Sequence, residues 1–148
     1  MLESLINLMG GFQTALTPVN LLFCLGGVAM GMFVGVLPGL GPVAGTALLI
    51  PMTYGLEPVT AIIMLAGIFY GAMYGGTITS VLINTPGEGA SVITCIDGYQ
   101  MARQGRAGQA LGVAAIGSFV GGTIALLILG FSLLSEGLQR RAQQGREV

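Results

Sequence analysis

Two short segments rich in proline and glycine are the part of this 148-residue chain best suited to bind a small ion. The first break is LPGLGP at residues 37–42, and the second break is INTPGEGAS at residues 83–91. Both interrupt apolar stretches, and an irregular backbone persists inside a bilayer only where it is buried in protein or lines a wet cavity. At such breaks the free N–H groups of a half-helix can face an anion, while unwound carbonyl groups can hold a cation.

The candidate ligands are backbone groups at the first break and polar side chains near the second. At the first break they belong to Pro38, Gly39, Leu40, Gly41 and Pro42. Near the second break they are the side chains of Thr77, Thr79, Ser80, Asn84 and Thr85. Ordinary loops at the membrane surface remain an alternative for both breaks, and Glu88 fits such a loop.

Residue types that support other chemistry are scarce. The chain has neither His nor Lys, which removes His-based triads, most zinc sites, a Walker-type phosphate loop and a basic surface for nucleic acid. Gly39, Gly41 and Gly45 resemble a dinucleotide-binding turn, but that turn must follow a strand rather than a membrane-length apolar run. We therefore expect no enzyme activity, no bound metal, no cofactor and no nucleic-acid partner, and we expect Cys24 and Cys95 to be reduced thiols.

The composition indicates what kind of protein positions these breaks. Hydrophobic residues make up 53% of the chain and charged residues 7%, with a mean hydropathy of +0.87. No charged residue lies between Glu3 and Glu57 or between Arg106 and Glu136, so the intervening stretches are long enough to cross about 30 Å of hydrocarbon. We predict an all-α integral membrane protein with glycine-packed transmembrane helices and a broken or re-entrant element around the Pro-Gly loop.

The expected segments begin with an interfacial amphipathic helix at residues 1–16, with Gly10-Gly11 in its middle. A transmembrane region at 17–135, of about three to five segments, follows it. Thr17 and Pro18 read as an N-cap and first position of a helix that can run to Leu37.

Residues 43–56 form an apolar stretch too short to cross alone, so it reads as half of the broken or re-entrant element. Further apolar stretches cover 58–83 and 107–135, on either side of a polar segment at 97–109. A polar tail at 136–148 ends the chain.

Glycines recur every four residues and predict close helix packing, because small residues let helix backbones approach each other in lipid. The spacing holds for Gly27, Gly31, Gly35 and Gly39, for Gly67, Gly71 and Gly75, and for the pairs Gly108–Gly112 and Gly117–Gly121. A substrate passing close to the backbone is the functional alternative.

Three segments, GMFVGVLPGLGP, YGAMYGGTITSVLINTPGEGAS and DGYQMARQGRAGQAL, closely resemble the large membrane subunit of tripartite tricarboxylate transporters over roughly residues 15–130. The positions that match the first loop of that family are Gly35, Pro38, Gly39, Gly41 and Pro42. Those that match its second motif are Asn84, Thr85, Pro86 and Gly87, and Asp97, Gly98 and Tyr99 match the polar turn that follows. The resemblance adds Pro86 and Gly87 to the predicted substrate-binding residues.

The resemblance implies a permease subunit in the bacterial inner membrane that takes up carboxylates such as citrate. Its partners would be a small membrane subunit and a periplasmic solute-binding protein, with Na⁺ or H⁺ as the coupling ion. The 148 residues correspond to a quarter to a third of such a subunit, and we find no match beyond Leu129, so a truncated product with a non-native tail is one hypothesis. A small membrane scaffold, in which the glycines serve only helix packing, is the alternative function.

The positions of the arginines imply conflicting orientations for the last apolar stretch. Arg103 and Arg106 favour a cytoplasmic 97–108 segment, and Arg140, Arg141 and Arg146 favour the same side for the tail, although a single span separates the two groups. Either the 107–135 stretch is broken near Gly121-Gly122, or the tail is not native-like.

Overall fold

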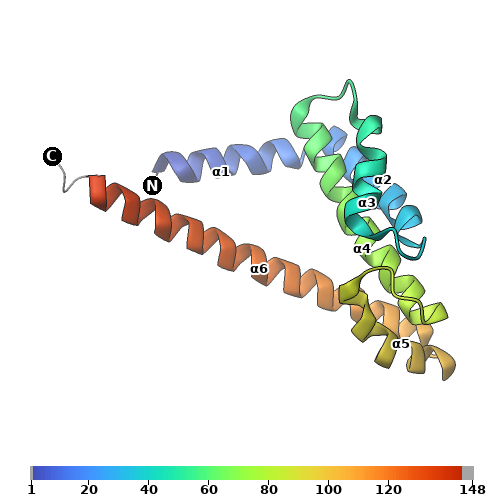
Figure 1. Cartoon of the computed structure of the whole chain (residues 1–148). Helices are drawn as coiled ribbons and strands as arrows, with labels where there is room; N and C mark the ends of the chain where they lie inside the picture. Colours follow the sequence, from blue (N-terminus) through green and yellow to red (C-terminus); the bar gives the residue numbers. More distant parts are fainter. Residues whose placement is uncertain (1, 145–148) are drawn as a thin grey trace. The chain divides into compact units, whose positions relative to one another are not determined.

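The computed structural model describes residues 2–144, and their regular structure is entirely helical (Figure 1). The helices are α1 (Leu2–Ala15), α2 (Pro18–Gly35), α3 (Gly41–Leu49), η1 (Ile50–Thr53), α4 (Pro58–Ile83), η2 (Gly89–Ser91), α5 (Val92–Arg103) and α6 (Ala107–Gln144), with η marking 3₁₀ turns. Three segments are long and apolar enough to cross a membrane: α2, α4 and residues Ala107–Ser132 of α6. The predicted all-α membrane fold is confirmed. The chain divides into two compact units, Met1–Leu111 and Gly112–Val148, which we describe separately.

The N-terminal helices begin where the sequence predicts them. Thr17 is the N-cap of α2 in an extended conformation, and Pro18 is its first residue. The Thr17 hydroxyl donates to the Thr14 carbonyl at 2.9 Å instead of capping a helix N–H. α2 ends at Gly35, two residues before the predicted end at Leu37, because Pro38 lacks an N–H and disfavours helical backbone at the residue before it. α1 continues through Gly10-Gly11, so these glycines do not interrupt it, and its place at a membrane interface stays a prediction.

α2 and α4 pack through interlocking glycines. Gly27, Gly31 and Gly35 of α2 lie against Met64, Ile68 and Ala72 of α4. Gly67, Gly71 and Gly75 of α4 lie against Cys24, Val28 and Met32 of α2. Both sets of partners advance by four residues in the same direction along the chain, so α2 and α4 run parallel in a constant register.

This packing brings the two backbones into direct contact. A Cβ atom placed on Gly67 would lie 2.6 Å from the Cys24 carbonyl oxygen, closer than real Cβ atoms approach. At Gly31 and Gly71 the nearest atom is likewise a backbone carbonyl oxygen of the facing helix. Such proximity allows Cα–H···O contacts and dense dispersion packing, the forces that hold helices together where lipid removes the hydrophobic drive. The packing function predicted for these glycines is confirmed.

A buried polar pair joins the beginnings of the same two helices. The Thr60 hydroxyl donates to the Asn20 side-chain oxygen at 2.7 Å, and both residues are buried. The Asn20 amide donates in turn to the Thr14 carbonyl at the end of α1, at 2.8 Å. These bonds satisfy groups that would otherwise be costly to bury, and they place the start of α4 beside the start of α2.

α3 and η1 form the short interrupted element predicted near the first break. α3 has nine residues and passes into the 3₁₀ turn η1 at Ile50, the residue before Pro51. Proline removes an N–H from the helical ladder, which explains why α3 does not continue as one regular helix. Both pieces pack on α4, and α3 also contacts α2.

The polar segment and the last apolar stretch differ from prediction. Asp97, Gly98 and Tyr99 lie within α5 rather than in a turn, because Gly98 packs against Val81 of α4 and a helix here buries that face. The turn comes later, at Gln104–Arg106, where Gly105 has a φ of +76°.

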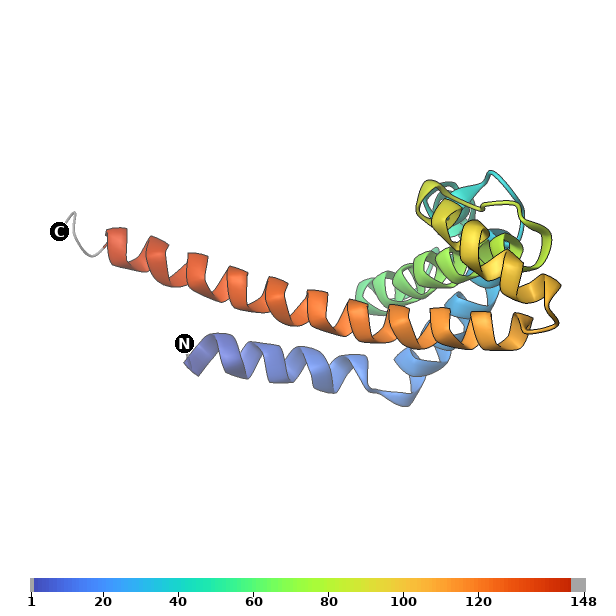
Figure 2. The ribbon, with the colours of Figure 1, turned by 90° about the horizontal axis from the view of Figure 1, so that it is seen from below.

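α6 runs unbroken from Ala107 to Gln144 and passes through Gly121-Gly122 (Figure 2). The break near Gly121-Gly122, one of the two alternatives for this stretch, is not observed, because a glycine costs a helix only about 1 kcal/mol and still keeps the backbone ladder. The expected tail at 136–148 therefore begins inside α6, and residues 145–148 lie outside the described residues. Within unit 1, the first turns of α6 are held by a bond of 3.2 Å from the Tyr74 hydroxyl to the Leu111 carbonyl. Gly108, Gly112, Gly117 and Gly121 have no atom of another segment within 4 Å among the described residues, so the packing partner predicted for these pairs is not observed.

Candidate functional site

At the first break the backbone alternates between left-handed and right-handed conformations, and the left-handed ones are easily adopted only by glycine. Gly39 has a φ of +87° and Gly41 a φ of +64°, while Leu40 between them is right-handed at −73° and −40°. Alternation of this kind points successive N–H groups toward one side of the chain and forms a concavity that suits anions. Pro38 and Gly39 are exposed, and no atom of another segment lies within 4 Å of a Cβ placed on Gly39.

The start of α3 adds a partial positive charge to this concavity. α3 begins at Gly41 with Leu40 as its N-cap, and no side chain caps its first turn. Pro42 is buried at the second position and has no N–H to leave unpaired. The Leu40 N–H donates to the Leu37 carbonyl at 3.4 Å, so the N–H donors that the first break can offer are those of Gly39 and Gly41. A helix N-terminus carries about +0.5 charge and adds a favourable potential for an anion.

The second break begins where α4 ends at Asn84. This residue is exposed and left-handed, with a φ of 56°, a conformation that Asn tolerates better than most residues. The N–H of Thr85 returns to the Thr79 carbonyl at 3.4 Å and closes the helix end. The chain then folds back over α4 instead of continuing along it.

The hydroxyl groups near the second break donate to nearby backbone carbonyls. Thr79 and Ser80 are buried and both donate to the Gly76 carbonyl, at 2.9 and 2.8 Å. Thr77 donates to Met73 at 3.3 Å, and Thr85 donates to Ile83 at 3.3 Å. In this arrangement the hydroxyls brace the helix and its end rather than pointing donors at a ligand, although each oxygen can still accept a bond.

The structure brings the two breaks together at Gly41 and Gly87. A Cβ placed on Gly41 would lie 4.0 Å from the Gly87 carbonyl oxygen, and one placed on Gly87 would lie 3.4 Å from the Gly35 oxygen. Gly87 is buried at this meeting point, whereas Asn84 and Pro86 are exposed. The junction therefore joins the end of α2, the start of α3 and the loop after α4.

Gly76 is a residue of this junction that the sequence reasoning missed. A Cβ on Gly76 would lie 3.3 Å from the Gly87 Cα. Gly76 does not belong to the four-residue spacing of Gly67, Gly71 and Gly75. A glycine that this spacing does not explain was the sequence feature that could have indicated a second contact.

Charge is nearly absent from the junction. Glu88 carries the one ionisable side chain of the two breaks, and it forms a capping box with Ser91 at the start of η2. No arginine lies in either break, so the potential for an anion comes from backbone dipoles.

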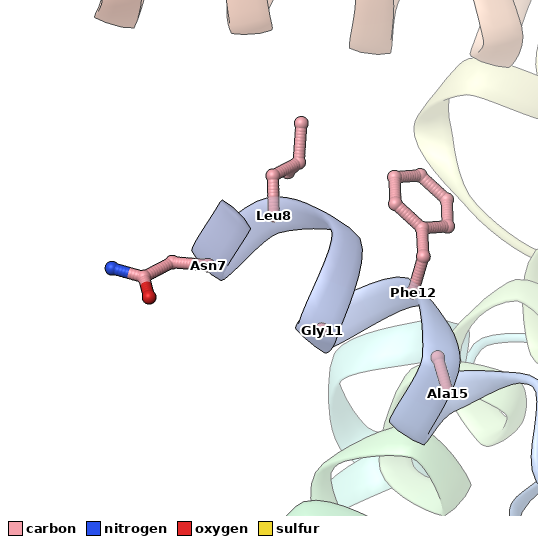
Figure 3. Close-up of a pocket in the computed structure, with 5 residues that line it drawn as sticks. All are labelled: Asn7, Leu8, Gly11, Phe12 and Ala15. Carbon is pink, nitrogen blue, oxygen red and sulfur yellow. The ribbon is translucent and has the colours of Figure 1, made fainter. Parts of the chain in front are cut away.

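A hollow of about 270 Å³ lies elsewhere, on α1 (Figure 3). It is lined by Asn7, Leu8, Gly11, Phe12 and Ala15. Leu8 and Phe12 extend on the same side of the helix, and Asn7 points away from them. These residues all belong to one helix and include none of the candidate ligands.

Comparison with known proteins places both breaks in a single family. A sequence profile of the tripartite tricarboxylate transporter TctA family matches residues 21–137. The match reaches past Leu129, where the resemblance was expected to end, so the correspondence includes the first part of the expected tail. No solved structure matches the chain.

A relative from Agrobacterium vitis, described as an uncharacterized 52.8 kDa protein in the TAR-I ttuC' 3'region, is 59% identical over 129 residues. The aligned part is 87% of this chain and 26% of the relative, so the chain spans about a quarter of that protein. The profile match covers most of the chain and includes α2 from Leu21 onward, α3, α4 and both breaks. This chain belongs to the tripartite tricarboxylate transporter TctA family.

Proposed function

We propose that this chain is the N-terminal part of the membrane permease subunit of a secondary transporter. It takes up tricarboxylates or related carboxylates together with a cation, across the bacterial inner membrane, as a multi-pass protein. The small membrane subunit and a periplasmic solute-binding protein of the same system are its partners. The observation that carries the proposal is the meeting of the two breaks at Gly41 and Gly87.

The charge balance of the junction favours a co-bound cation. The N-terminus of α3 supplies about +0.5 charge, and a second half-helix of that kind would raise the total to about +1. A di- or trivalent carboxylate is not compensated by that amount, and neither break contains an arginine. A co-bound Na⁺ or H⁺ supplies the missing charge, so the substrate and the coupling ion enter together.

Ligand-dependent stability of the purified chain tests this proposal. We expect citrate with Na⁺ to raise its unfolding temperature in detergent, because a ligand that binds only the folded state at 100 times its Kd adds about 2.7 kcal/mol. Gly41→Val should remove that shift, since valine resists a φ of +64° and its side chain would fill the concavity.

Gly26→Val is the matched control, because Gly26 is exposed on α2 and no atom of another segment lies within 4 Å of a Cβ placed there. An equal citrate shift in Gly41→Val, or no shift in the unmodified chain, would count against the junction as the anion site. Absence of any shift together with co-purification of a membrane partner would favour the scaffold alternative.

A further inference from the structure

The adjacent glycines Gly75 and Gly76 serve different faces of α4. A Cβ on Gly75 would meet the Met32 carbonyl oxygen of α2 at 2.5 Å and the Gly35 Cα at 2.9 Å. A Cβ on Gly76 would instead meet the Gly87 Cα at 3.3 Å. Successive residues of a helix point about 100° apart, so Gly75 contacts the neighbouring helix while Gly76 contacts the folded-back loop.

Gly87 packs against two other glycines, Gly76 and Gly35. A Cβ placed on it would collide with the Gly76 Cα and would lie 3.4 Å from the Gly35 carbonyl oxygen. Gly87 does not have a positive φ, so its conformation is open to any residue and the requirement for glycine here is one of space. The loop after α4 reaches the end of α2 because neither Gly76 nor Gly87 has a side chain.

The carbonyl group of Gly76 is held in place by two side-chain hydroxyl groups. Its carbonyl accepts the hydroxyl protons of Thr79 and Ser80, and Ser80 has no exposed surface. Hydroxyl groups that bond back to a carbonyl one turn earlier often bend a helix locally. Two such bonds to one carbonyl hold the peptide on which the loop rests.

We propose that Gly76 is a positioning residue that seats Gly87 against the end of α2 and thereby holds the second break beside the first. This inference rests on the proposed function, because it assigns the contact that completes the anion site. Gly76 acts through Gly87 and touches no substrate. The buried hydroxyls of Thr79 and Ser80 serve the same purpose through their bonds to the Gly76 carbonyl.

Cross-linking between the two breaks measures this role directly. Cysteines are introduced at Leu40 and Pro86, which are both exposed and each lie next to one of the meeting glycines, in a chain with Cys24→Ala and Cys95→Ala. A short bifunctional thiol reagent should join the two positions in the detergent-solubilised chain.

Gly76→Val should lower the cross-linking rate by about tenfold, because overpacking of the contact favours a displaced loop. Gly87→Ala should have the same effect from the loop side, and Gly26→Val should leave the rate unchanged. Gly87 lies outside every helix. If circular dichroism shows that Gly76→Val reduces the helix content, Gly87→Ala therefore provides the test of the contact. An unchanged rate in Gly87→Ala, or no cross-linking in the parent, overturns the inference.

Citrate binding separates this role from the proposed function. In the chain with its native Leu40, Pro86 and cysteines, Gly76→Val should raise the citrate concentration needed for half of the thermal shift by about tenfold. An unchanged concentration in a variant whose cross-linking is lost overturns the positioning role. A parent chain that citrate does not stabilise contradicts the proposed function, while the cross-linking result still decides whether Gly76 seats Gly87.

Discussion

At the scale of single residues, the hydrogen bond between Asn20 and Thr60 connects two helix starts that lie 40 positions apart in the sequence. Both side chains are buried, and no buried side-chain polar atom of the described residues lacks a hydrogen-bond partner. In an apolar surrounding a lone amide or hydroxyl costs free energy, so this pair favours one register of α2 against α4 over the registers that would separate it.

A double-mutant cycle with Asn20→Ala and Thr60→Val measures that contribution. Interhelical hydrogen bonds in membrane proteins average about 0.6 kcal/mol and reach about 1.7, so we expect a coupling free energy in that range. Denaturant unfolding in micelles provides the four stabilities. Additive single effects would show that the pair does not contribute to stability as a unit.

At the scale of elements, the glycine spacing predicted that α2 and α4 pack closely, and the structure confirms it. The four-residue period of Gly27, Gly31 and Gly35 identifies one face of a helix whatever its partner is. The identity of the partner and the parallel direction could not be predicted, because a period describes one helix and not the register between two. Gly76 was missed for the same reason, since its contact depends on where the loop after α4 returns.

Gly27 tests the interface between α2 and α4, and its neighbour Gly26 provides the control. Gly27→Ala should destabilise the pair by roughly 1–3 kcal/mol, since a Cβ there would collide with the Met64 backbone and the helices would have to separate. Gly26→Ala points away and should be neutral or stabilising, by up to about 1 kcal/mol of helix propensity. Thermal unfolding in detergent compares them. Equal destabilisation by the two substitutions would contradict the assigned interface.

At the scale of the whole molecule, the continuity of α6 bears on the orientation of the chain. Residues Ala107–Ser132 are apolar and long enough to cross a membrane, and the helix passes through Gly121-Gly122 without a break. Arg103 and Arg106 precede this segment and Arg140 and Arg141 follow it, so the positive-inside tendency cannot be satisfied at both ends if the segment spans.

Side-specific labelling of single cysteines at Gln104 and Ser135 tests the span. These positions flank the apolar segment, so a membrane-impermeant thiol reagent should reach them from opposite sides of inner-membrane vesicles. We expect α6 to span the membrane although arginines lie on both sides of it. Burial of about 26 apolar residues in the bilayer gains more free energy than the unfavourable placement of one arginine group costs. Labelling of both positions from one side would show that α6 does not cross.

The parallel course of α2 and α4 makes residues 36–57 a return passage. A chain that leaves α2 at Gly35 must travel back along the whole pair before α4 can begin beside Asn20. Nine residues of α helix cover about 13 Å and four of 3₁₀ helix about 8 Å, and the chain then turns at Thr53–Leu56, where the Leu56 N–H donates to the Thr53 carbonyl at 3.1 Å. A count of long apolar helices therefore misses this return passage, which contains the first Pro-Gly break.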